Sequence, residues 1–545
     1  MKATKDMVES KSDTFDENWK IADDLRGAVD GWDFKQYVLG AIFYRFLSEN
    51  LSRVLDDASK KYAARDDAEA EKARGGIIRK FGYFIKPSEL FINLLTRVSL
   101  GRATQYGGVV DKEKIRQEVE KVDETLKNAF DNVVGSTYGA KSEELYRDLF
   151  SDFDVANSRL GSSKKARSEK LVEILEKVAE MKLKFDADDD PDAARYGDAF
   201  EDLLARYASG AGKSGGEFFT PSCVSRLLVK LGAVGRTRVR SVYDIACGSG
   251  SLLLKSLGEF GRAAAPEFYG QEINKTNYNF CRINMLLHEV DYTRVKIYND
   301  DTLVRPKGPD ADPANFYGLR ERFDLVVSNP PYSQKWEGNG NPVLEGDERY
   351  KPAGKLAPNA NSDLAFVMHA LYTLNSSGTA AIVCFPGIFY RGGAERTIRK
   401  YLVDNNFVDA VILLPSNLFF GTQIVTCVFV LKKGRESDAR VLFVDASSEF
   451  EKKIANSNAL SDANIERIVG EYASRAEEPY FARLASRDEI AQADYNLAVS
   501  AYVESRDARE RVDIVGLNRE IDEIVERQSE LRERIAEIVA DLQQE

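Results

Sequence analysis

The 545-residue chain carries a formal net charge of −12, with 76 Lys and Arg residues against 88 Asp and Glu residues. This acidic balance argues against a protein that wraps DNA by itself through a broad basic face, so any phosphate affinity must be local or supplied by a partner. Five cysteines lack metal-ligand spacing, and the chain has only two histidines. We therefore expect no metal site, no disulfide framework and no histidine-based hydrolytic centre.

The chain divides into three predicted parts, which is consistent with its 43% hydrophobic content. Residues 1–170 form a predicted helical domain, in which Phe34, Val38, Ile42 and Phe46 recur on one helical face. An acidic run at 186–192 indicates a loop, and alternating strand and helix patterns predict an α/β domain over residues 171–480. The N-terminus has no apolar signal region and no run reaches membrane length, so we expect a cytoplasmic protein without a membrane partner.

A predicted strand, a small-residue turn and a helix follow one another from Val239 to Leu254. Gly248 and Gly250 let the backbone approach an anionic group at the start of the helix. The next predicted strand ends at Glu272, about 20 residues later, where a ribose-binding carboxylate is expected. Either feature alone fits an ordinary turn or a surface acid, but together they predict a nucleotide-type site.

The tetrad Asn329-Pro330-Pro331-Tyr332 follows an apolar run and therefore stands at the carboxyl end of a buried strand. An amino group conjugated to a ring is a poor nucleophile, because its lone pair is delocalised. The Asn329 oxygen and the Pro330 carbonyl can each accept one N–H and turn that lone pair towards an incoming methyl group. The prolines stiffen the turn, and Tyr332 offers a ring for stacking a flipped base. The tetrad predicts methylation of a conjugated amino group.

The methyl donor follows from two observations taken together. The glycine loop lacks a third glycine at the usual dinucleotide spacing, and the amino-group pocket lies downstream of it. Both favour S-adenosylmethionine over a dinucleotide. A third predicted strand, 295–298, ends at an acidic turn, where Asp301, or Asp300 beside it, could accept a hydrogen bond from the cofactor's adenine amino group.

Three later features complete the predicted architecture. The polar segment 333–362 is long for a loop, and we predict that it is mobile in the free chain and orders around a flipped adenine. Further strands at 380–385, 408–414 and 425–431 would join one mostly parallel, doubly wound sheet. In the C-terminal helical tail, 481–545, apolar residues step by four and three as in a coiled-coil seam, interrupted by Gln528. The seam comprises Leu517, Ile521, Ile524, Gln528, Leu531, Ile535, Ile538 and Leu542.

These motifs resemble the N6-adenine DNA methyltransferases, and more closely the modification subunits of type I restriction-modification systems. The segment Gly216–Pro221 resembles the family's cofactor-binding segment, and it precedes the glycine loop as in the gamma motif order. Residues 413–422 resemble a late family motif, and residues 25–27 resemble the family's N-terminal region. The family has proline where this chain has Ile245, a departure that leaves the neighbouring Asp and glycines in place.

The resemblance implies a site-specific adenine methyltransferase that acts on double-stranded DNA with S-adenosylmethionine. On residue type alone, the two phenylalanines of the cofactor segment are more often core residues, and Thr220-Pro221 is also a good helix start. The implied cofactor contacts are Glu217, Phe218, Phe219, Thr220, Pro221, Ser222, Asp244, Ala246, Cys247, Gly248, Ser249, Gly250, Ser251 and Glu272.

A methyltransferase that finds its own target needs a domain that reads base edges, and no free segment is large enough for one. We therefore expect a separate specificity subunit, with the tail as the docking element, although the seam could instead pack on the chain's own body. The resemblance implies that two copies of this chain join one specificity subunit, and that restriction subunits then add the nuclease. Two alternatives stay open: a protein glutamine N5-methyltransferase, and a catalytically silent, cofactor-binding assembly scaffold.

Overall fold

The computed structural model describes residues 2–25, 34–56, 60–99, 111–185, 193–210, 220–304, 323–419, 423–452, 458–504 and 514–542. One compact unit spans Met1–Val503, and a second spans Glu504–Glu545. Several sequence predictions lie outside the described residues: Arg26 and Gly27, the acidic run 186–192, the cofactor-segment residues Glu217, Phe218 and Phe219, and the end of the late motif, 420–422.

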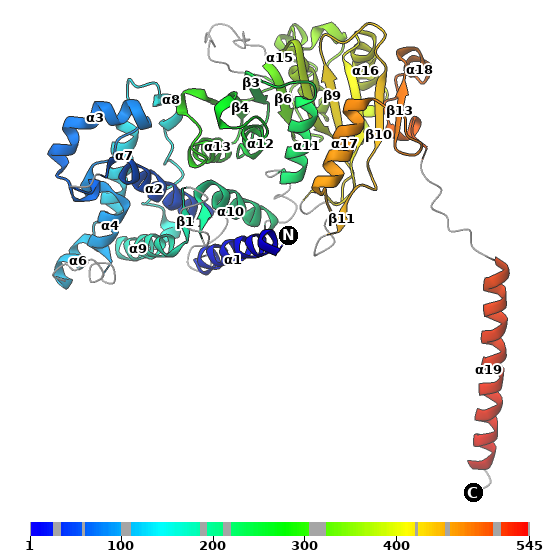
Figure 1. The fold of residues 1–545 in the computed structure, drawn as a ribbon, viewed down its shortest axis with the longest axis horizontal. Helices are drawn as coiled ribbons and strands as arrows, with labels where there is room; N and C mark the ends of the chain where they lie inside the picture. Colours follow the sequence, from blue (N-terminus) through cyan, green and yellow to red (C-terminus); the bar gives the residue numbers. More distant parts are fainter. Residues whose placement is uncertain are drawn as a thin grey trace. The chain divides into compact units, whose positions relative to one another are not determined.

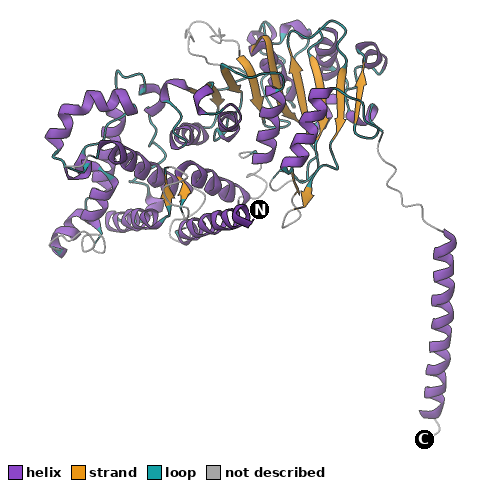
Figure 2. Ribbon diagram, in the orientation of Figure 1, coloured by secondary structure: helices purple, strands orange, loops and turns teal. Residues whose placement is uncertain are grey.

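The first 210 residues are mainly helical (Figure 2). In α2, Val38, Ile42 and Phe46 are buried on one face, as their spacing predicts. Two short strands, β1 (Leu183–Lys184) and β2 (Ala194–Arg195), pair in parallel. The principal helices are α1 (Lys2–Asp24), α2 (Phe34–Leu55), α3 (Asp67–Phe81), α4 (Phe91–Val98), α6 (Lys112–Val119), α7 (Val122–Gly135), α8 (Glu143–Tyr146), α9 (Lys164–Glu180) and α10 (Tyr196–Gly210).

A nine-stranded sheet organises the rest of the first unit, in the order β13-β10-β8-β9-β7-β6-β3-β4-β5. Of its described strands, β9 and β13 run opposite to the others. The mostly parallel, doubly wound fold is thus confirmed. The strands are β3 (Ser241–Asp244), β4 (Glu267–Glu272), β5 (Val295–Asn299), β6 (Phe323–Ser328), β7 (Leu374–Cys384), β8 (Val408–Leu413), β9 (Cys427–Lys432), β10 (Val441–Asp445) and β13 (Ala482–Ala485).

Helices cover both faces of this sheet (Figure 1). Alternate strand residues face the two layers. Val242 and Leu325 pack with the first layer, whereas their neighbours Tyr243 and Val326 pack with the second. The first layer contains α11 (Ser222–Ala233), α12 (Ser251–Phe260), α13 (Lys275–Leu287) and α17 (Asp462–Ser474), and the second contains α15 (Asp363–Thr373), α16 (Ala394–Asp404) and α18 (Arg487–Gln492).

The helical region joins the sheet domain through α13. Arg282 is fully buried, and its guanidinium donates hydrogen bonds to the carbonyls of Glu144, Leu145 and Arg147 at 2.8–3.2 Å. Asn279 on the same helix donates to the Asp152 carboxylate at 2.7 Å. Because a buried guanidinium without acceptors is costly, these bonds fix α13 against the helical region.

Two elements differ from the sequence predictions. Strand β13 pairs with β10, so the sheet continues past residue 480 and the compact unit ends at Val503. We therefore propose to move the start of the tail from residue 481 to residue 504. The segment 333–362 is also not an open loop: it contains α14 (Pro342–Glu345), and it buries Leu344 and Tyr350 against the second layer. Its few apolar residues thus anchor the segment in this structure, and its mobility in the free chain stays a prediction.

The second unit contains a single described helix, α19 (Ile514–Leu542), as the tail pattern predicts. The seam residues Ile521, Ile524, Leu531, Ile535 and Ile538 are all exposed in it. Among the described residues, no helix combines the length and apolar composition that a membrane span requires.

Close packing of α11 on β6 predicts an asymmetry between two helical glycines. A methyl group at Gly232 would overlap Cδ1 of the buried Leu325, whereas nothing lies within 4 Å of the same position at Gly258 in α12. We expect Gly232→Ala to lower the free energy of unfolding by about 1–3 kcal/mol through overpacking. Gly258→Ala is the matched control and should be neutral or stabilising, because alanine favours a helix. Urea unfolding of both variants measures the difference, and equal stabilities would contradict the packing described.

Candidate active site

The two motifs predicted to carry the chemistry meet where the sheet reverses its strand order. From β3 the chain proceeds to β4 and β5 on one side, and then returns to place β6 on the other side of β3. Strands β3 and β6 are parallel neighbours, with Val242 opposite Leu325. Their carboxyl ends therefore lie side by side at the position where open α/β sheets bind ligands.

Asp244, the last residue of β3, joins these two strand ends. Its Oδ1 accepts hydrogen bonds from the Ser328 hydroxyl at 2.7 Å and from the Ala246 N–H at 3.1 Å. Burial raises the pKa of Asp244 to about 7, although both hydrogen bonds act in the opposite direction. Asp244 thus ties the glycine loop after β3 to the residue that precedes Asn329.

The glycine loop has the backbone conformation that its sequence predicts. Gly248 and Gly250 have φ values of 52° and 79°, in the left-handed region that favours glycine. A Cβ at Gly250 would also lie 2.7 Å from Sγ of Cys281, so this position lacks room for a side chain. Ser251 begins α12 directly after the loop. The loop therefore presents backbone and small side chains at a helix start, where an anion is favoured.

Glu272, at the end of β4, holds the same loop from the other side. One carboxylate oxygen accepts the Gly248 N–H at 2.9 Å, and the other accepts the Asn274 N–H at 2.8 Å. Burial raises the pKa of Glu272 above its ordinary value, against these backbone hydrogen bonds. Each oxygen retains a lone pair, so the carboxylate can also accept hydrogen bonds from a diol at the adjoining cavity.

The acidic turn after β5 distinguishes the two candidate aspartates. Asp301 lines the cavity, and its Oδ1 accepts the N–H groups of Leu303 at 2.8 Å and Val304 at 3.3 Å. Asp300 instead accepts the Asp301 N–H at 2.9 Å and does not line the cavity. The geometry therefore favours Asp301 as the residue that faces a ligand.

The tetrad forms a tight turn at the end of β6. Asn329 donates its amide to the Thr220 hydroxyl at 3.0 Å, and its oxygen accepts the Tyr332 hydroxyl. Burial raises the pKa of Tyr332 well above its ordinary value, so the hydroxyl stays protonated and donates. Ser333 follows with φ of 52°, and Asp363 at the start of α15 accepts its N–H at 3.0 Å. The turn thus rests on α15.

An aromatic pair stands beside this turn. The rings of Tyr332 and Phe419 lie edge to face, with centroids 6.4 Å apart. Phe419 belongs to the late motif, which follows β8, and β8 is separated from β6 in the sheet by β9 and β7. The sequence predicted that Tyr332 supplies a ring, and the structure adds this second aromatic residue from a distant part of the chain.

One cavity of about 830 Å³ collects most of the predicted site residues. Of the described candidates, Pro221, Ser222, Gly250 and Pro330 do not line it, and Ser222 is exposed. The cavity wall also includes Gln271, Asn277 and Phe366, which the sequence analysis did not assign, and residues 333–337 of the segment predicted to order around a flipped adenine. The predicted residues on the wall are Thr220, Asp244, Ala246, Cys247, Gly248, Ser249, Ser251, Glu272, Asp301, Asn329, Pro331 and Tyr332.

Comparisons with known proteins identify the family. A family model for N-6 DNA methylases matches residues 192–511, and a model of the HsdM N-terminal domain matches residues 17–178. The type I restriction enzyme MpnII methylase subunit of Mycoplasma pneumoniae is 46% identical over 96% of this chain and 95% of that protein. The chain belongs to the N-6 DNA methylases and, among them, to the type I restriction enzyme methylase subunits.

Solved structures agree with this assignment. The type I restriction-modification methyltransferase subunit of Streptococcus thermophilus matches 91% of this chain and 100% of that chain, with a TM-score of 0.76 and 34% identity. A chain from a study of complex assembly and conformational transition in the type I R-M system has a TM-score of 0.61 over 95% of this chain and 98% of its own, and its 20% identity shows the shared fold.

The family decides between the enzyme classes left open by the sequence. The methylase subunit is an N6-adenine DNA methyltransferase, as its motifs predict, and this assignment sets aside the protein glutamine methyltransferase. Within the described residues, no group of three or more His, Cys, Asp or Glu side chains could hold a metal ion.

The buried Asp244 predicts a pH-dependent stability difference. Its folded pKa, about 7, lies above its ordinary value of 3.8, so the folded state holds this proton more tightly than the unfolded state. The contribution of the protonated form is present at low pH and is lost as pH rises from about 4 through 7. The melting temperature of Asp244→Asn, measured relative to that of the natural chain, should therefore increase as pH rises from 5 to 8. A constant difference across that range would contradict the buried, protonated carboxyl.

Proposed function

We propose that the cavity binds S-adenosylmethionine together with a flipped target adenine, and that a separate subunit selects the DNA sequence. Three observations support a nucleoside-bearing cofactor in this cavity. The backbone at Gly248 is open to a ligand, Glu272 can accept hydrogen bonds from ribose hydroxyls, and Asp301 can accept one from an adenine amino group. A cavity of about 830 Å³ has room for both a cofactor and a base.

The proposed cofactor set keeps the described cavity residues of the sequence prediction. The loop from Ala246 to Ser251 would approach the amino-acid end, Glu272 the ribose, and Asp301 the adenine. S-adenosylmethionine supplies, when bound, a methyl group on a positively charged sulfur. The residues Glu217 to Phe219 stay part of the proposal through the resemblance alone, whereas Pro221 and Ser222 contribute by starting α11 and not by lining the cavity.

On the acceptor side, the Asn329 oxygen and the Pro330 carbonyl would hold the adenine N6 hydrogens, and Tyr332 would stack on the ring. Pro330 does not line the cavity, so its carbonyl enters the proposal through the sequence prediction alone. The Tyr332 hydroxyl bonds to the Asn329 oxygen in this structure. That oxygen has two lone pairs, so it could accept an amino N–H beside the hydroxyl. Asn329 would thus turn the nitrogen lone pair towards the methyl group that the bound cofactor would supply.

The charge distribution supports a partner for DNA binding. Some of the described basic residues on the surface are paired within the chain: Lys164 pairs with Glu124 at 2.7 Å, and Arg396 pairs with Asp494. Arg399 is buried and donates to the backbone carbonyls of Ile388 and Tyr495. A net charge of −12 adds no general attraction for DNA.

We further propose that α19 docks on a specificity subunit, in an assembly that contains a second copy of this chain and to which restriction subunits add the nuclease. The apolar seam of α19 supports docking, because Ile524, Leu531 and Ile535 lie on a helix face that no other described element of its own unit covers. The assembly would act on double-stranded DNA in the cytoplasm.

The catalytic assignment predicts different effects of two substitutions at Tyr332. In the chain assembled with its specificity subunit, Asn329→Ala should reduce methylation by about 100-fold or more, because one of the two amino-group acceptors is lost. Tyr332→Ala should cost a similar factor through loss of the stacking ring. Tyr332→Phe should retain most activity, because it keeps the ring and removes only the hydroxyl that bonds to Asn329. N6-methyladenine mapping of DNA from expressing cells measures all three.

The same mapping tests the wider proposal. Methylation at one DNA motif should require both this chain and the specificity subunit. Methylation by this chain alone would reveal an overlooked recognition domain. Full methylation with Asn329→Ala would support the scaffold alternative, in which another protein carries the chemistry.

Docking through α19 predicts that a substitution in the seam prevents binding of the specificity subunit and leaves cofactor binding unchanged. A charge in the seam, Ile524→Asp, should abolish co-purification with the specificity subunit, since an interface core excludes an unpaired charge. Ser529→Asp places the same group on another face of the helix and is the matched control. Both variants should bind S-adenosylmethionine as the natural chain does, as calorimetry can show. Normal co-purification of Ile524→Asp would show that the seam does not dock.

A further inference from the structure

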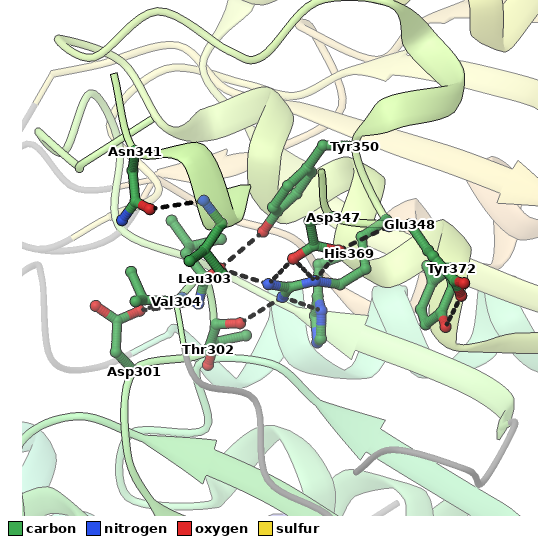
Figure 3. A network of polar contacts seen from close by, with 12 residues as sticks. Asp301, Thr302, Leu303, Val304, Asn341, Asp347, Glu348, Tyr350, His369 and Tyr372 are labelled. Atoms are coloured by element: carbon green, nitrogen blue, oxygen red, sulfur yellow. Dashed lines mark hydrogen bonds and ion pairs between the residues drawn. The ribbon is translucent and has the colours of Figure 1, made fainter. Parts of the chain in front are cut away.

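A buried arginine from the segment after the catalytic tetrad reaches the turn that carries Asp301. Figure 3 shows Asp347, Tyr350 and His369 around this turn. Arg349 is 2% exposed and pairs with Asp347, whose side chain is equally inaccessible. Its guanidinium donates to the carbonyls of Thr302 at 2.8 Å and Leu303 at 2.6 Å. These carbonyls follow Asp301 directly, although they stand 46 or 47 residues before Arg349 in the chain.

Every donor of this guanidinium is used. Besides the two carbonyls, Nε and Nη2 donate to the Asp347 carboxylate at 2.6–3.1 Å, and Nη1 lies 3.0 Å from Nδ1 of His369. Arginine offers five N–H groups in a fixed planar fork, so no other side chain can make this set of bonds. Tyr350 adds a hydroxyl donor to the Leu303 carbonyl at 3.1 Å.

Arg349 also determines which tautomer His369 adopts. Because a guanidinium only donates, Nδ1 of His369 must accept, and the single ring proton is on Nε2. That proton points to the Tyr243 hydroxyl, 3.2 Å away, and the hydroxyl donates to Gln271 at 3.3 Å. Gln271 lines the cavity, and its main-chain carbonyl accepts the Cys247 N–H of the glycine loop at 3.0 Å. Buried contacts through His369, Tyr243 and Gln271 therefore link Arg349 to the cofactor loop.

The peptides after Asp301 are held from both sides. The Asp301 carboxylate accepts the Leu303 and Val304 N–H groups, while Arg349 binds the carbonyls of Thr302 and Leu303. Residues 334–337, from the same segment as Arg349, line the cavity. The Trp336 ring lies edge to face with Tyr350 at 5.5 Å, which joins the cavity wall to the residues that hold the turn.

We propose that Arg349 is a positioning residue for the cofactor: it fixes the 301–304 turn so that Asp301 meets the adenine amino group. This proposal rests on the proposed cofactor site. It makes cofactor affinity depend on a residue that follows the catalytic tetrad, outside the motifs that resemble the family's cofactor segments. The segment 333–362 thereby links the two sides of the cavity: residues 334–337 line the wall next to the tetrad, and Arg349 binds the turn on the cofactor side.

The test is the affinity of the full chain for S-adenosylmethionine by isothermal titration calorimetry. Arg349→Met should raise Kd by about tenfold or more, which corresponds to about 1.4 kcal/mol or more. Arg349→Lys should not rescue it, because one ammonium cannot replace the fork. Tyr350→Phe should raise Kd by a smaller factor. Arg399→Met is the matched control, since Arg399 is also buried and bonds to backbone carbonyls, but none of its acceptors lines the cavity.

Steady-state kinetics distinguish a positioning role of Arg349 from a purely structural role, which would lower kcat and weaken DNA binding as well. With the specificity subunit present, Arg349→Lys should raise KM for the cofactor and leave kcat at saturating cofactor and KM for DNA near the natural values. Unchanged Kd in Arg349→Met and Tyr350→Phe, or equal weakening in Arg399→Met, would overturn the proposal. Failure of the cofactor site itself is distinguishable, because then the natural chain would not bind S-adenosylmethionine or Asp301→Ala would bind it with full affinity.

Discussion

The hydrogen bond from Ser328 to Asp244 joins the two strands on which the site depends. Asp244 ends β3 and Ser328 ends β6, so this contact sets the glycine loop beside Asn329 at the point where the strand order reverses. A methyl transfer requires donor and acceptor at close range in a fixed orientation. The sheet contributes to this requirement by placing the two loops on neighbouring, buried strands.

The rest of the site consists of groups that hold these loops in place. Glu272 binds the glycine loop through backbone N–H groups, Asp363 binds the turn after the tetrad, and Arg349 binds the turn after β5. Burial raises the pKa of Asp244, Glu272 and Asp363, whereas the hydrogen bonds that each accepts act in the opposite direction.

Local patterns predicted much of this molecule. The sequence could assign roles to Gly248, Glu272 and Asn329, because each of them ends or closely follows an apolar strand. General rules for parallel sheets then place the ends of such strands at the ligand site. Arg349 and Trp336 could not, because their partners are remote in sequence and their segment is polar in composition. Phe419 and β13 were likewise determined by tertiary packing. The roles of Glu217 to Phe219 rest on the resemblance alone, since these residues lie outside the described structure.

The most direct test of the account is a crystal structure of this chain with sinefungin, an analogue of S-adenosylmethionine in which an amine-bearing carbon replaces the methylated sulfur. The account predicts that the adenine contacts Asp301, the ribose contacts Glu272, and the amine points towards Asn329. Sinefungin bound outside the cavity between β3 and β6, or with its amine directed away from Asn329, would contradict it.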